Sequence, residues 1–150
     1  MYPTVSDQLR EIRRVLASVV QPEVSGEYAR ETLSAVLATL RMLEGAWDRV
    51  LPFLRWDNDQ VARVLGEVAA GAGPELAGRI ARVLVAAPPD PTDFEASHRR
   101  NLDLRALLVD AMPTLPEAAG GGLPAPLVAY VRERIARYPF SATASLPARG

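Results

Sequence analysis

Apolar residues of this chain recur every three or four positions over most of its length, which is the period of an amphipathic α-helix. No segment shows the sustained alternation of apolar and polar residues that is typical of a half-buried β-strand. Prolines interrupt the pattern, and proline disfavours a helix interior because it lacks a backbone N–H. The spacing predicts helices over residues 5–21, 26–51, 59–70, 75–86, 93–112 and 126–137. We therefore predict an all-α fold, an irregular bundle of five to six helices with a long second helix.

Polar residues and one proline give specific predictions for where these helices begin and end. Pro52 should end or kink the second helix, because its ring clashes with the preceding turn. Asp57 and Asn58 are typical N-capping residues and are predicted to cap the third helix. Thr92 and Glu95 have the spacing of a capping box, in which each side chain bonds the other residue's backbone N–H, at the start of the fifth helix.

Two proline-rich joints, near residues 87–91 and 113–126, separate the last helices from the rest of the chain. The second joint is long for a compact domain, which favours either a mobile segment or one packed against a partner. The last helix alone offers too little apolar surface for a core of its own. We therefore predict a single helical domain over residues 1–150.

Composition excludes several chemistries. The chain has no Cys, one His and no Lys, so all 17 basic residues are Arg. No thiolate nucleophile, Cys zinc site or site built from two histidines is possible within one chain. Schiff-base chemistry and P-loop phosphate binding both need a lysine. We predict neither a cofactor nor a metal site, and no enzymatic activity is favoured.

The charge is balanced overall but uneven along the chain. The net charge of −1 gives no general attraction to nucleic acid or to an anionic membrane. Residues 57–98 carry a net charge of −4 and residues 99–150 a net charge of +3. These segments can attract each other, within one chain or between two copies, or can simply be solvated helix faces. No apolar run reaches the length of a membrane span and the N-terminus lacks signal-peptide features, so we predict a cytoplasmic protein.

His98 and Glu95 are the weak candidates for catalysis. They lie one helical turn apart, so an imidazole and a carboxylate could share a face. Phe94 and Leu102 lie on the same stripe as His98, which equally favours a half-buried structural histidine. Catalysis predicts that His98→Ala abolishes an activity, whereas a structural role predicts only a lower melting temperature.

Candidate residues for binding a ligand or partner are one tryptophan and four arginines. Trp56 lies at a predicted helix–helix corner and is either a core residue or an interface anchor. Arg99, Arg100, Arg132 and Arg134 could grip a carboxylate or phosphate in two-point fashion. Pairing with the acidic middle of the chain is the structural alternative for these arginines.

Three segments carry a resemblance to a known group of proteins: residues 26–43, residues 51–58 with the sequence LPFLRWDN, and residues 132–139 with the sequence RERIARYP. In these segments the chain resembles small, all-helical bacterial proteins of unassigned function encoded beside phosphotransferase-type kinases and acyl-CoA dehydrogenases. The resemblance implies an accessory protein in acyl-CoA or hydroxy-acid metabolism that assists a kinase. It supplies no catalytic residues.

The sequence leaves two main functional hypotheses. The first is a non-catalytic accessory or interaction protein whose partner is another protein or a second copy of itself, as in a homodimer. The alternative is a small-molecule binding protein that holds an acyl or phosphorylated ligand between helices, with arginines at its acidic end. A pocket that opens beside Arg99, Arg100 or Arg132 would favour the alternative. An enzyme that uses His98 is less favoured.

Overall fold

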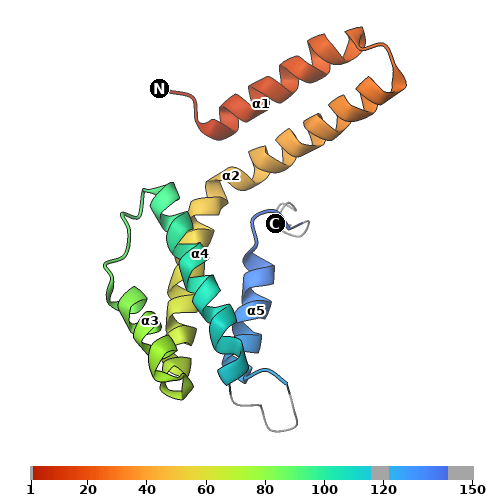
Figure 1. The fold of residues 1–150 in the computed structure, drawn as a ribbon. Coiled ribbons are helices and arrows are strands. Elements are labelled where there is room, and N and C mark those ends of the chain that lie inside the picture. The colour runs from red at the N-terminus through yellow and green to blue at the C-terminus, as the bar shows by residue number, and fades with distance from the viewer. Residues whose placement is uncertain (1, 116–121, 142–150) are drawn as a thin grey trace, which may run out of the picture. The chain divides into compact units, whose positions relative to one another are not determined.

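The computed structural model describes residues 2–115 and 122–141, and in this part of the chain it contains five α-helices and no β-strand (Figure 1). The prediction of an all-α fold is therefore confirmed. The helices are α1 (Val5–Val15), α2 (Glu27–Val68), α3 (Pro74–Val85), α4 (Phe94–Ala111) and α5 (Ala125–Arg137). Residues 116–121 of the second proline-rich joint lie outside the described residues.

The described chain divides into two compact units. Residues 2–50 and 138–141 form unit 1, and residues 51–115 and 122–137 form unit 2. The first boundary lies within α2, two residues before Pro52, and neither boundary falls at a proline-rich joint. The single domain over residues 1–150 stays a prediction, and we describe each unit separately.

Unit 1 is a helical hairpin whose first helix has a well-defined start and stop. The Thr4 hydroxyl accepts a hydrogen bond from the Asp7 backbone N–H at 3.1 Å, and the Asp7 carboxylate accepts from the Thr4 N–H at 3.1 Å. This reciprocal capping box satisfies two backbone donors at the helix start. After α1 the chain continues as a π-helical turn over Leu16–Val20 and a 3₁₀ turn over Gln21–Glu23, and Pro22 lies in that last turn. Helical turns therefore cover the whole predicted range 5–21, but the α-helical part ends at Val15.

The second helix does not end at Pro52, which was one of the two predicted outcomes, because α2 runs as one helix through 42 residues with Pro52 inside it. The other outcome, a kink at Pro52, stays a prediction. Asp57 and Asn58, predicted as caps, are interior residues of this helix and are buried. The proline costs one backbone hydrogen bond, that to the carbonyl of Asp48. Both Asp48 and Pro52 are exposed, so water can satisfy the freed carbonyl. The apolar side chains that follow, Phe53 and Leu54, are buried only if the helix continues.

Replacing Pro52 by Ala is expected to raise the free energy of unfolding by about 1–2 kcal/mol. The restored backbone hydrogen bond and the removal of the ring clash stabilise the helix by more than the greater freedom of the unfolded chain destabilises it. Chemical denaturation followed by circular dichroism measures the change. Pro74→Ala is the matched control, because Pro74 is the first residue of α3, where its missing N–H costs nothing. A Pro52→Ala variant no more stable than the parent would contradict a continuous α2.

Unit 2 packs α3, α4 and α5 around the C-terminal half of α2 (Figure 1). Every one of these four helices contributes to one apolar core, which contains Val61, Val64, Leu65, Ile80, Leu104, Leu107, Leu108, Ala111, Leu127 and Tyr130. The predicted helices over residues 75–86, 93–112 and 126–137 are each confirmed to within one residue at both ends.

The predicted capping box at the start of α4 is wrong. Asp93 is the N-cap, and its carboxylate accepts from the Ala96 backbone N–H at 2.9 Å. Thr92 instead donates its backbone N–H and its hydroxyl to the Asp90 carboxylate, at 2.7 and 2.6 Å. Thr92 is therefore held in the turn before the helix, and Glu95 is left exposed in the first turn.

Candidate functional site

Three ionic or polar contacts fix how the two helices of unit 1 face each other. The Ser6 hydroxyl donates to Asp48 at 3.2 Å, and Arg10 and Arg13 both donate to the Glu44 carboxylate, at 2.8 and 3.0 Å. Residues near the start of α1 therefore meet residues near position 48 of α2, as in an antiparallel pair (Figure 1). The two arginines hold the pKa of the Glu44 carboxyl below its ordinary value, mainly through the hydrogen bond from Arg10.

Apolar residues directly precede the contact positions on both helices. On α1, Val5 and Ile12 directly precede the contact residues Ser6 and Arg13. On α2, Leu43 and Trp47 directly precede the contact residues Glu44 and Asp48. Consecutive residues of an α-helix are rotated by about 100° about the helix axis. In an antiparallel pair, the residues that directly precede the contact positions on the two helices therefore point to the same side of the pair. These apolar residues therefore line one face of the hairpin.

We call this surface the hairpin face. Its apolar residues follow alternating spacings of three and four, which is the pattern of helices that pack in bundles. The members are Val5, Leu9, Ile12, Leu16 and Val19 on the first helical segment and Val36, Leu40, Leu43, Trp47 and Val50 on α2. None of the ten is buried, and Ile12 and Val19 remain 50% and 61% exposed. The opposite side of α1 carries the ion pairs Arg10–Asp7 and Arg14–Glu11.

Unit 2 contains a buried polar cluster around Asp57, whose side chain is fully buried. The Asp57 carboxylate accepts from the Tyr130 hydroxyl at 2.8 Å and from the Asn101 amide at 2.9 Å, and it pairs with Arg134 at 3.2 Å. The Asn101 amide also donates to Asn58 at 3.0 Å. Burial raises the pKa of the Tyr130 hydroxyl, and the bond to Asp57 raises it further, so Tyr130 stays protonated and donates. This cluster joins α2, α4 and α5.

Trp56 and Arg134 both make internal contacts in unit 2. The half-buried Trp56 ring stacks on Tyr130, with ring centres 6.4 Å apart, and the Arg137 guanidinium lies 4.8 Å above it. Arg134 lies over the Phe53 ring at 5.6 Å while it pairs with Asp57. These contacts correspond to the structural alternatives for both residues, and their role in binding a partner stays a prediction.

His98 and Glu95 are on α4 but show no catalytic arrangement. The half-buried His98 ring stacks on Phe94, with ring centres 6.0 Å apart and planes inclined by 10°. Among the described residues, no hydrogen bond or ion pair joins His98 to Glu95 or to Asp93, whose carboxylate caps the helix. His98 therefore has the surroundings of a packed side chain.

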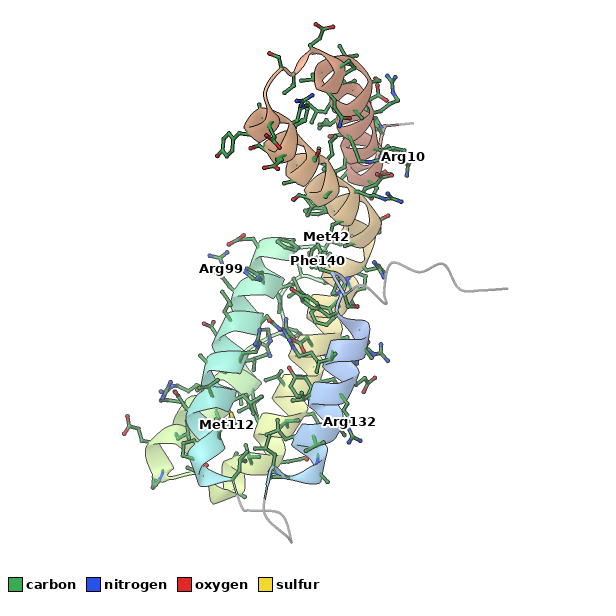
Figure 2. All side chains as sticks on the ribbon, turned by 90° about the vertical axis from the view of Figure 1, so that its right-hand side faces the viewer. Arg10, Met42, Arg99, Met112, Arg132 and Phe140 are labelled. Carbon is green, nitrogen blue, oxygen red and sulfur yellow. The ribbon has the colours of Figure 1, made fainter. Side chains whose placement is uncertain are left out.

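The structure does not bring the other predicted arginines to one site. Arg99 and Arg132 are exposed and project outward from α4 and α5 (Figure 2). Arg100 is half-buried, and its guanidinium donates to the Ala86 carbonyl over a long 3.4 Å. Arg100 also lines a cleft, together with Arg55, which the sequence analysis did not single out.

The comparisons with known proteins give no relative for this chain: no family model, no curated protein and no solved structure matches it. Within residues 2–115 and 122–141, no group of three His, Asp or Glu side chains is placed to hold a metal ion. Over the same residues, no helix combines the length and apolar character needed to cross a membrane.

Proposed function

We propose that this chain is a non-catalytic interaction protein that pairs with a second copy of itself through the hairpin face. The supporting observation is that both helices of unit 1 turn their apolar stripes to the same side. In a four-helix bundle, each helix directs its apolar stripe toward a common centre in this way. The hairpin then supplies two of the four helices, and a twofold-related copy supplies the other two.

The size of the hairpin face suits a dimer contact. The first helical segment has 16 residues, 11 in α1 and five in the π turn, so it is about 24 Å long. Two helices side by side are about 20 Å wide, which gives roughly 1,000 Å² of contact summed over two copies. Specific interfaces begin at about that area.

The charge of unit 1 also suits self-pairing. Residues 2–50 contain six Arg and seven acidic residues, so two copies meet without strong repulsion. The charged side chains of α1 pair with each other or with Glu44 and lie away from the hairpin face. The accessory role beside a kinase or an acyl-CoA-metabolising enzyme, which the resemblance implies, stays a prediction that does not depend on this pairing.

Replacing Ile12 by Glu is expected to convert a dimer into a 16.2 kDa monomer, because it places a charge at the centre of the hairpin face. Sedimentation equilibrium or light scattering measures the mass. Ser18→Glu is the matched control, since it adds the same charge at an exposed position on the opposite side of the same helical segment. This control should remain a dimer.

Two results would overturn the proposal. If the parent protein is monomeric at high concentration, the hairpin face is not a dimer contact. A dimer that persists in Ile12→Glu pairs through another surface. Circular dichroism of each variant checks that its helices remain folded.

A further inference from the structure

We propose that unit 2 binds a small organic monocarboxylate in a cleft beside Ser97. This inference is independent of self-association, which concerns unit 1. The cleft has a volume of about 340 Å³, at the lower end of the range for ligand sites. Its apolar wall consists of Ala62 on α2 and Pro88, Pro89 and Pro91 in the loop before α4. Such a wall suits a small hydrocarbon body.

Ser97 is the polar group that most clearly calls for a ligand. Its side chain is only 1% exposed, yet its hydroxyl has no hydrogen-bond partner among the described residues. A helical serine commonly bonds a carbonyl of the preceding turn, as Ser18 does with Arg14 at 2.8 Å. An unpaired buried hydroxyl is costly. Because Ser97 lines the cleft, an acceptor oxygen of a bound ligand would satisfy it.

The charges around the cleft favour a single negative charge on the ligand. Arg55 and Arg100 both line it, and Asp59 is the one acidic side chain among the described residues of its lining. The net charge of +1 matches a carboxylate better than a doubly charged phosphate. The remaining polar lining residue, Asn58, already donates to the Ser97 carbonyl at 3.0 Å, which holds the two elements of the cleft together.

Binding of sodium hexanoate to the full-length protein tests the proposal by isothermal titration calorimetry. We expect saturable binding in the parent, and a Kd raised about tenfold or more in Ser97→Ala and in Arg100→Gln, because each loses a hydrogen bond to a charged group. Arg99→Gln is the matched control: it removes the same charge from the neighbouring position of α4 but lies outside the cleft. Its Kd should stay within about twofold of the parent value.

Inorganic phosphate and uncharged hexanol identify which part of the ligand matters. Both should bind much more weakly than hexanoate. Tighter binding of phosphate than of hexanoate would overturn the assignment to a carboxylate. A Kd for hexanoate above about 10 mM would overturn the site, and so would a loss of affinity in Arg99→Gln equal to that in Arg100→Gln. Without ligand, Ser97→Ala should melt at the same or a higher temperature, since it removes an unpaired buried hydroxyl. A lower melting temperature would mean that the hydroxyl bonds within the protein, which also contradicts the proposal.

Discussion

Replacing Asp57 by Ala is expected to lower the free energy of unfolding by about 3–5 kcal/mol, the cost of breaking a buried ion pair from one side. The carboxylate is the common acceptor for Tyr130, Asn101 and Arg134. Without it, two buried donors and one partly buried cation lose this acceptor together, and α5 loses the polar contacts of Tyr130 and Arg134 that join it to α2. Urea denaturation followed by circular dichroism measures the change.

Arg134→Met is the informative comparison for this cluster. The Arg134 side chain is 23% exposed, so its guanidinium can be hydrated, and its loss still leaves Asp57 with two donors. We expect a loss of about 1–2 kcal/mol, well below that of Asp57→Ala. Equal losses in the two variants would mean that the ion pair, rather than the shared acceptor, stabilises the cluster. A loss below about 1 kcal/mol in Asp57→Ala would contradict the role of Asp57 altogether.

The helices themselves were predictable, because the spacing of apolar residues along the sequence has the period of an α-helix. The fusion of two predicted helices into α2 was not predictable in this way. Pro52 and the polar run after it carry strong local signals for a helix end and a new cap. Tertiary packing overrides them, because Leu54 and Val61 are buried only on a continuous helix. The sequence nonetheless contains an indication of the continuous helix. Asp57 lies three positions after Leu54 and four before Val61, so on one continuous helix it shares their buried face.

The candidate sites were less predictable than the helices, for reasons that differ between the two units. On the hairpin, spacing identified apolar residues such as Leu16 and Leu40, but spacing cannot say whether a neighbouring helix of the same chain covers them. In unit 2, the cleft joins Arg55 to Ser97 and Arg100 from a distant part of the sequence. No local pattern links such residues. Arg99 and Arg100 are adjacent on α4, and because adjacent helical residues face different directions, Arg100 lines the cleft and Arg99 does not.

Replacing Trp56 by Ala is expected to lower the free energy of unfolding by about 3 kcal/mol, at the lower end of the range for removing a large aromatic because Trp56 is half-buried. The variant loses its ring contacts with Phe53 and Tyr130 and the cation that Arg137 places over the ring. The same Tyr130 donates to Asp57, so the loss also loosens the polar cluster. Urea denaturation measures the loss.

The oligomeric state of Trp56→Ala separates its two interpretations. As a core residue of unit 2, Trp56 affects stability, while the mass in solution stays that of the parent. As an interface anchor, it affects the mass, while stability changes by less than about 0.5 kcal/mol. Ile12→Glu on the hairpin face has the reverse expectation, so the two variants form a matched pair. If Trp56→Ala dissociates into monomers without losing stability, the dimer interface lies on unit 2 rather than on unit 1.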